Sequence, residues 1–143
     1  MAATFRQTRL RRLLNLFIAP LARLGLAGKR THVLTVVGRK SGRRYSTPVQ
    51  LVFLDGRRWL VAPYGERPWV WNARAAGQVE LTRALRTERV PVEEVDPQTA
   101  APVLREYLRK TPVTKSYFEP AADSPLAEFA AEAPRHPVFR LKD

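Results

Sequence analysis

Cysteine is absent from the 143 residues of this chain, which excludes disulfides, thiolate metal sites and cysteine nucleophiles. The absence also suits a reducing compartment, and we predict a cytoplasmic location. Histidine is nearly absent, because the chain has only His32 and His136, and neither has a close partner at the spacing of metal ligands. Both lie beside predicted strands, so we expect structural or surface roles for them and no metal site.

Acidic residues are absent from the first 44 positions, which carry eleven lysines and arginines, and the first acid is Asp55. The other 99 residues carry fourteen basic and thirteen acidic groups and are nearly neutral. The net charge of +12 therefore belongs to the N-terminal third of the chain. Such a charge indicates an anionic partner, which is nucleic acid, a membrane surface or a phosphorylated small molecule.

Apolar runs long enough to span a bilayer are also absent, and no clear cleavage site indicates a signal peptide. Residues 5–26 place leucine, isoleucine and phenylalanine near helical spacing with five arginines among them, and Pro20 should kink or restart this helix. Two interpretations stay open. The helix rests on the inner face of an anionic membrane, or it packs over the core with solvated arginines, which is the commoner arrangement.

From residue 31 onward the apolar pattern changes to that of strands. Short apolar or alternating runs are bounded by turn residues, and Asp55-Gly56 between two of them is a strong hairpin signal. Proline at a first helical position and glycine after a last one indicate short helices between the strands. We predict strands over 32–37, 46–54, 58–63, 78–84, 87–95 and 137–141, and helices over 68–76, 97–110 and 125–133.

Six strands with only short helices between them favour a small β-barrel with helical additions. A Rossmann sheet is disfavoured, because the strands do not alternate regularly with crossover helices. The length is that of one ordinary domain. We therefore expect a single domain of the mainly β or α+β class, with an amphipathic helix in 1–28 and the barrel in 29–143.

Two glycines, a serine and four cationic residues directly follow the first predicted strand, in the loop GRKSGRR at 38–44. Glycine allows the backbone to approach a ligand closely, successive amides can form an anion-binding nest, and arginine can bind phosphate through two hydrogen bonds. Neither the Walker spacing nor G-x-G-x-x-G is present. The residues alone leave two interpretations open, a phosphate site and a solvent-exposed basic turn.

Three aromatic residues, two of them tryptophans, are concentrated in the segment APYGERPWVWN at 62–72. Tryptophan is costly to expose, so such a segment covers a pocket or packs into the core. Both interpretations stay open for Trp69 and Trp71. Asn72 offers a donor and an acceptor that suit a planar heterocycle.

In LTVVGRKSGRRYSTPV (34–49), DGxxWLVA (55–62) and PWVWNARAAG (68–77), and more faintly in HPVFRL (136–141), the chain resembles the deazaflavin-dependent nitroreductase family. The resemblance implies a six-stranded split β-barrel like that of FMN-binding and pyridoxamine-phosphate-oxidase-like proteins. It also implies coenzyme F-420 (F420), an 8-hydroxy-5-deazaflavin with a phosphodiester and several glutamate carboxylates in its tail. Members commonly have Pro-Arg where this chain has Arg44-Tyr45.

By position in these motifs, the resemblance assigns cofactor contacts to the basic loop, the start of the next strand and the aromatic segment. The loop would contact the phosphate, and the aromatic segment would offer backbone groups and close over the ring. The residues so implied are Gly38, Arg39, Lys40, Ser41, Gly42, Arg44, Tyr45, Ser46, Thr47, Pro48, Val49, Gln50, Ala62, Pro63, Tyr64, Gly65, Pro68, Trp69, Val70, Trp71 and Asn72. The candidate proton donors are Tyr64 and Tyr117, of which Tyr117 is similar to a family tyrosine at the substrate pocket.

The activity implied by the resemblance is transfer of a hydride from reduced F420 to an electron-poor acceptor, which is a quinone, an enone or a nitroaromatic compound. Two alternatives remain. One is a non-catalytic basic protein that binds nucleic acid or a membrane, and the other is a split-barrel protein that uses FMN or haem. We expect no nucleic acid partner, because the aromatic residues lie away from the basic segment, whereas single-strand binders interleave the two. The sequence leaves monomer and homodimer open.

Overall fold

The computed structural model describes residues 18, 20, 21, 24 and 28–143. The predicted amphipathic helix at 5–26 lies outside the described residues except at four positions, so its packing or its contact with a membrane stays a prediction. Among the residues that are described, no helix is long and apolar enough to cross a membrane.

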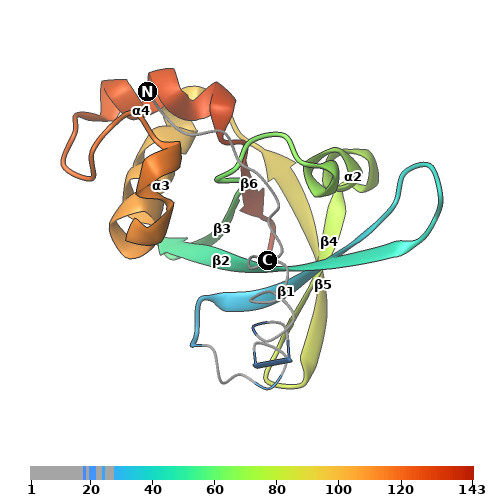
Figure 1. The fold of residues 1–143 in the computed structure, drawn as a ribbon. Helices are drawn as coiled ribbons and strands as arrows, with labels where there is room; N and C mark the ends of the chain where they lie inside the picture. The colour runs from blue at the N-terminus through green and yellow to red at the C-terminus, as the bar shows by residue number, and fades with distance from the viewer. Residues whose placement is uncertain (1–17, 19, 22–23, 25–27) are drawn as a thin grey trace.

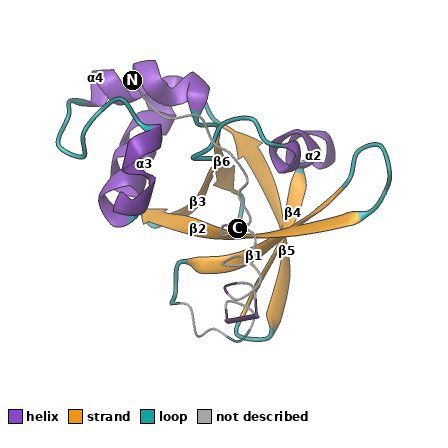
Figure 2. Cartoon of the chain, in the orientation of Figure 1, coloured by secondary structure: helices purple, strands orange, loops and turns teal. Residues whose placement is uncertain are grey.

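Six antiparallel strands form a closed barrel (Figures 1 and 2). They are β1 (Thr31–Val37), β2 (Arg44–Leu54), β3 (Arg57–Val61), β4 (Gln78–Arg83), β5 (Arg86–Glu94) and β6 (Val138–Leu141). Their order around the barrel is β1-β2-β3-β6-β5-β4, and pairing of β4 with β1 closes the ring. The predicted six-stranded barrel is thus confirmed, with boundaries within two residues of those expected for most strands.

Alternate side chains of the strands fill the barrel, because successive residues of a strand point to opposite faces. On β1, Leu34 and Val36 are buried in the interior. Thr35, between them, shares a 2.8 Å hydrogen bond with the hydroxyl of Ser46 on β2. The interior cluster comprises Leu34, Val36, Leu51, Leu60, Ala62, Val70, Ala73, Val79, Leu81, Val90, Val92, Phe139 and Leu141.

Helices cover two sides of this barrel (Figure 1). They are the α-helices α2 (Pro68–Ala76), α3 (Pro97–Lys110) and α4 (Leu126–Glu132) and the 3₁₀ helices η1 (Pro112–Tyr117) and η2 (Ala133–Arg135). The carboxylate of Asp96 accepts a hydrogen bond from the Thr99 amide at 2.8 Å and caps α3, as the sequence predicted. Helices α3 and α4 pack together around Leu104 and Phe129, which belong to a second core cluster with Val52 and Val61 of the barrel.

Two hairpin turns use positive φ angles. Asp55 and Gly56 join β2 to β3 with φ of 56° and 70°, which confirms the predicted turn. Ala84 and Leu85 join β4 to β5 with φ of 52° and 61°. The second turn has no sequence signal, because side chains of this kind rarely adopt positive φ. The short helix η1 was not predicted either.

The barrel interior gives a direct stability test. We expect Leu34→Ala to lower the free energy of unfolding by about 2–5 kcal/mol, because the side chain is fully buried and its removal leaves a cavity. Val37→Ala, on the same strand but 46% exposed, should cost less than about 1 kcal/mol. Urea unfolding followed by circular dichroism measures both, and equal losses would contradict this placement of the interior face.

Candidate functional site

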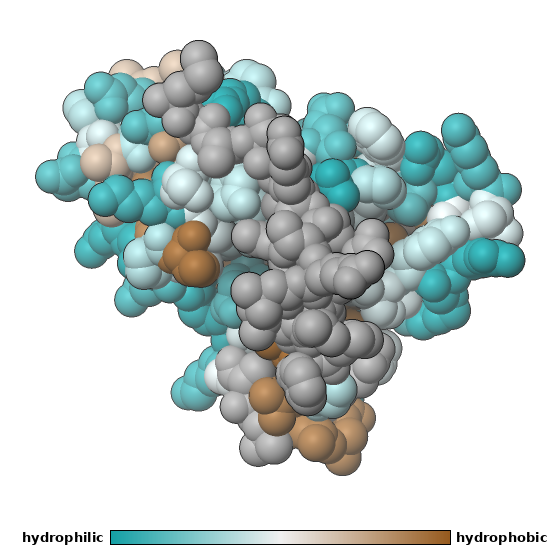
Figure 3. Space-filling view, in the orientation of Figure 1, coloured by the Kyte–Doolittle hydropathy of each residue, from teal (hydrophilic) through white to brown (hydrophobic). Residues whose placement is uncertain are grey.

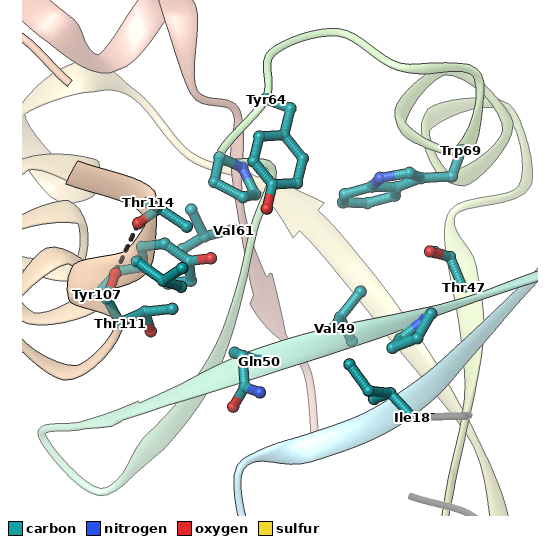
Figure 4. A pocket seen from close by; sticks show the side chains of 13 residues that line it. Ile18, Thr47, Val49, Gln50, Val61, Tyr64, Trp69, Tyr107, Thr111 and Thr114 are labelled. Carbon is teal, nitrogen blue, oxygen red and sulfur yellow. Dashed lines mark hydrogen bonds between the residues drawn. The ribbon is translucent and has the colours of Figure 1, made fainter. Parts of the chain in front are cut away.

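A cavity of about 240 Å³ lies between strand β2, the loop after β3, the start of α2 and the end of α3. Figure 4 shows the rings of Tyr64 and Trp69 on one side of it, with Val49 and Gln50 of β2 along the opposite side. Ile18, one of the four described positions of the N-terminal segment, also lines this cavity. The cavity therefore brings together three of the regions predicted from the sequence.

Of the two candidate proton donors, only Tyr64 lines the cavity. Tyr117, at the end of η1, packs against the Tyr64 ring edge to face, with 4.9 Å between ring centroids and 75° between planes. Tyr117 thus fixes the position of the Tyr64 ring. The structure thus places Tyr64 at the cavity and Tyr117 behind it.

Hydroxyl groups from the end of α3 and from η1 form the other side of the cavity (Figure 4). Tyr107, Thr111 and Thr114 lie there, and burial raises the pKa of Tyr107 far above its ordinary value. The Thr111 hydroxyl accepts a 2.8 Å hydrogen bond from the guanidinium of Arg30 and can donate its own proton toward the cavity. These residues were not predicted as site residues, because buried positions of an amphipathic helix carry no signal beyond packing.

Asn72, the fifth residue of α2, holds Arg39 of the basic loop in place. Its side-chain oxygen accepts hydrogen bonds from the Arg39 backbone amide at 3.0 Å and from the Arg39 guanidinium at 2.8 Å. The guanidinium also lies over the Trp71 ring, 5.2 Å from its centroid, a cation–π contact. The Asn72 oxygen is therefore engaged by the loop, and only its amide nitrogen remains for a heterocycle.

The basic loop is a tight turn whose own atoms satisfy several of its amides. The Gly38 amide donates to the Arg43 carbonyl at 2.7 Å, and the Gly42 amide donates to the Gly38 carbonyl at 2.9 Å. A Cβ atom on Gly38 would lie 2.7 Å from the Ser41 hydroxyl and 2.8 Å from the Tyr45 ring. The absence of a side chain at position 38 thus lets Ser41 and Tyr45 close over it, and a Cβ there would displace both.

The cationic side chains of this loop differ in their partners. Arg44 forms an ion pair with Glu80 of β4, and the Arg44 guanidinium lowers the pKa of that carboxyl. Among the residues that the structure describes, no acid lies within ion-pair distance of Lys40 or Arg43. Lys40 and Arg43 are therefore available to an anion, whereas Arg44 is engaged on the outer face of the barrel.

The remaining predicted contact residues fall into three groups, which line the cavity, bond elsewhere or lie in the core. Thr47, Pro48, Val49 and Gln50 line the cavity, as do Pro63 and Trp69. Ser46 bonds with Thr35 instead. Ala62 and Val70 are buried in the barrel interior, and Gly65, with φ of 88°, turns the loop that carries Tyr64. Within the described part, no cluster of histidine and carboxylate residues could hold a metal ion.

Comparison with known proteins identifies the family of this chain. A family model described as F420H(2)-dependent quinone reductase matches residues 21–123. Among solved structures, the chain is similar to an F420-H2 dependent reductase at 21% identity and a TM-score of 0.54, over 80% of this chain and 95% of that one. No curated protein matches the chain.

Two further solved structures share the fold. One is a protein of unknown function from Agrobacterium tumefaciens, with 18% identity and a TM-score of 0.56 over 99% of this chain and 57% of that one. The other is a heme binding protein from Mycobacterium smegmatis, with 14% identity and a TM-score of 0.53 over 97% and 52%. At these identities, the likeness extends to the split-barrel fold alone.

The contact between Asn72 and Arg39 can be tested without a ligand. Asn72→Leu leaves the Arg39 amide and guanidinium without their acceptor, and we expect it to lower the free energy of unfolding by about 1–3 kcal/mol. Asn72→Asp keeps an acceptor oxygen and should stay near the original stability. Chemical unfolding of the three proteins measures the difference, and an equal loss in both variants would argue against this hydrogen-bond anchor.

Proposed function

The chain belongs to the F420H(2)-dependent quinone reductase family, and from this premise we propose that F420 and a quinone meet in the cavity between Tyr64 and Trp69. The protein is a deazaflavin-dependent oxidoreductase, and its cofactor is coenzyme F420. Membership therefore favours an enzyme over the non-catalytic alternative, and F420 over FMN or haem. We propose in addition which acceptor is reduced and which residues contact F420 and the acceptor.

The basic loop fits the anionic tail of F420. Lys40 and Arg43 carry positive charge with no acidic partner among the described residues, and Arg39 is held by Asn72 and Trp71. An arginine fixed in this way loses little side-chain entropy when its remaining N–H groups bind an oxyanion. The amides of Lys40 and Ser41 add two backbone donors that no described residue uses. We assign Arg39, Lys40, Ser41 and Arg43 to the phosphate.

The cavity fits a flat ring system. Trp69, Pro48, Val49 and Pro63 give it apolar walls, and its volume of about 240 Å³ is suited to rings rather than to a whole cofactor. The tail therefore lies outside the cavity. Helix α2 joins the two places, since Trp69 faces the cavity and Asn72 holds the basic loop three residues later. This shared helix is the observation that carries the proposal.

When bound, reduced F420 supplies the hydride, and the protein supplies orientation and a proton. A quinone that takes up a hydride becomes a hydroquinone monoanion, and one proton then makes it the neutral hydroquinone. The Tyr64 hydroxyl points into the cavity (Figure 4) and is the proton donor that we propose. The apolar walls exclude water, which strengthens the hydrogen bond from Tyr64 to a carbonyl oxygen.

A quinone suits this cavity better than an enone or a nitroaromatic compound. The oxygens of a quinone lie on opposite edges of a flat ring, and the cavity offers hydroxyl donors on opposite sides. Tyr64 provides one of these donors and Thr111 the other, whereas the Thr114 hydroxyl donates to the Thr111 carbonyl. Enones and nitroaromatic compounds carry their acceptor oxygens on one edge only, so they engage one of the two sides.

Two measurements test the proposal as a whole. Titration of the protein into F420, followed by quenching of cofactor fluorescence, reports binding. Oxidation of reduced F420 with a quinone, an enone and a nitroaromatic compound then ranks the acceptors by kcat/KM. We expect binding, with the quinone ranked first. Salt-sensitive DNA binding without any effect on F420 would instead favour the non-catalytic alternative.

Lys40→Ala tests the tail site. We expect about tenfold weaker binding of F420, because a charge-assisted hydrogen bond to phosphate contributes roughly 1.5–3 kcal/mol. Thermal stability should stay nearly unchanged, since no described residue pairs with Lys40. Arg86→Ala at the far β4–β5 hairpin removes the same charge and is the matched control. Equal weakening in both variants would mean that only net charge matters.

Tyr64→Phe tests the proton donor. We expect kcat to fall by about 10–100-fold with a smaller change in KM, because general acid catalysis typically contributes about that much or more. Tyr117→Phe keeps the edge-to-face packing and should retain most of the activity. Steady-state kinetics with a quinone distinguish the two, and a larger loss in the Tyr117 variant would reverse the assignment.

A further inference from the structure

His136, just before β6, is buried with both ring nitrogens in hydrogen bonds. It is 2% exposed. Its Nδ1 lies 2.8 Å from the carbonyl oxygen of Pro63, and its Nε2 lies 2.7 Å from Oε2 of Glu132, which is 5% exposed. The imidazole ring stacks on Phe118 with 4.0 Å between centroids and 19° between planes. Such burial and bonding make the ring part of the wall behind the cavity.

The two hydrogen bonds of His136 need two protons. A neutral imidazole carries only one N–H proton, and an ionised carboxylate carries none. A backbone carbonyl only accepts, so Nδ1 must carry a proton to bond with Pro63. An ionised carboxylate also only accepts, so a further proton must lie between Nε2 and Glu132 Oε2. Burial lowers the pKa of His136, while the neighbouring Glu132 acts in the opposite direction. Whichever atom carries it, the pair shares one proton.

Three neighbouring segments supply polar, charged or aromatic groups around this pair. The Glu119 amide donates to Glu132 Oε2 at 3.3 Å. The Arg135 guanidinium lies 3.6 Å from Glu132 Oε1 and 3.7 Å from the Glu119 carboxylate. From α3, the ring of Tyr107 lies 6.3 Å from that of Phe118. The pair is thus enclosed by α3, by the end of η1 and by η2.

The same segment holds the loop that carries Tyr64. The Ala62 amide donates to the Pro137 carbonyl at 2.8 Å, and Pro63, bonded to His136, directly precedes Tyr64. A Cβ atom on Gly65 would lie 3.4 Å from the Arg135 carbonyl, so the loop and this segment are in close contact. On the other side, Tyr64 packs on Tyr117, whose neighbour Phe118 stacks on His136.

We propose that Glu132 and His136 are positioning residues that hold Tyr64 in the cavity through one shared proton. The inference rests on the proposed function in that Tyr64 is taken to face the acceptor. When the shared proton is lost at high pH, the neutral imidazole keeps a single N–H, which can bond to Glu132 or to Pro63 but not to both. The Pro63 carbonyl then loses its fixed donor position, and the Tyr64 hydroxyl loses its alignment with the acceptor.

Glu132→Gln separates the shared proton from simple packing. The glutamine amide donates its own N–H to Nε2, so a neutral imidazole satisfies both partners without a further proton. In the original protein we expect KM for the quinone to rise at least fivefold between pH 5 and pH 9, since the pKa of His136 lies below its ordinary value. In Glu132→Gln the rise should be less than twofold, with similar activity at pH 5. His32→Gln, which removes the other histidine, should keep the original pH profile.

Imidazole ¹⁵N NMR of the protein without cofactor gives a second measurement. Since the chain has two histidines, the His32→Gln spectrum assigns His136 directly. We expect Nδ1 to stay protonated throughout in Glu132→Gln, and the Nε2 shift to change with pH in the original protein but not in Glu132→Gln. An Nε2 shift that titrates identically in both proteins would overturn the proposal, as would identical pH profiles of KM.

The two proposals fail separately. Absence of F420 binding or of quinone reduction in the original protein would refute the proposed function, while the NMR result still decides whether the pair shares a proton. If Glu132→Gln does not fold, proton exchange of His136 in the original protein still decides the question. A His136 ring that exchanges its Nδ1 proton as fast as a solvent-exposed histidine would refute the positioning role.

Discussion

The four-residue strand β6 closes the barrel, and both the core and the cavity depend on that closure. It pairs with β3 on one side and β5 on the other, and it places Phe139 in the interior and Val138 in the outer core. A barrel closed in this way has no free edge, so every strand is held on both sides. The segment just before β6 then bonds to the loop after β3, which brings His136 and Pro137 to the wall of the cavity.

Helix α2 connects the two halves of the site. Its first residues present Trp69 to the cavity, and its next turn holds the basic loop through Asn72 and Trp71. Because the β1–β2 hairpin projects beyond the barrel (Figure 1), this anchor fixes its position relative to the cavity. The surface view shows mostly polar residues on this projecting hairpin (Figure 3), which agrees with the contact to an anionic tail that we propose.

Regular periodicity explains why most of the fold could be predicted. Strand alternation, the Asp55-Gly56 turn and the cap at Asp96 are local signals, and the structure confirms each of them. The turn at Ala84-Leu85 has no such signal, since the pairing of β4 with β5 imposes its positive φ angles. Among predicted site residues, Val70 lies inside the barrel, because a motif gives the neighbourhood of a ligand but not the face on which each side chain lies.

The sequence by itself determined the elements, the basic charge of the loop at 38–44 and the resemblance to a deazaflavin-using family. These depend on neighbouring residues and on composition. Only the tertiary structure decided which charges remain available to an anion, because Glu80 is distant in sequence from Arg44 and Asn72 from Arg39. It also decided that His136 is a buried partner of Glu132 and Pro63. Burial and long-range pairing depend on how separate strands meet, and no local pattern encodes them.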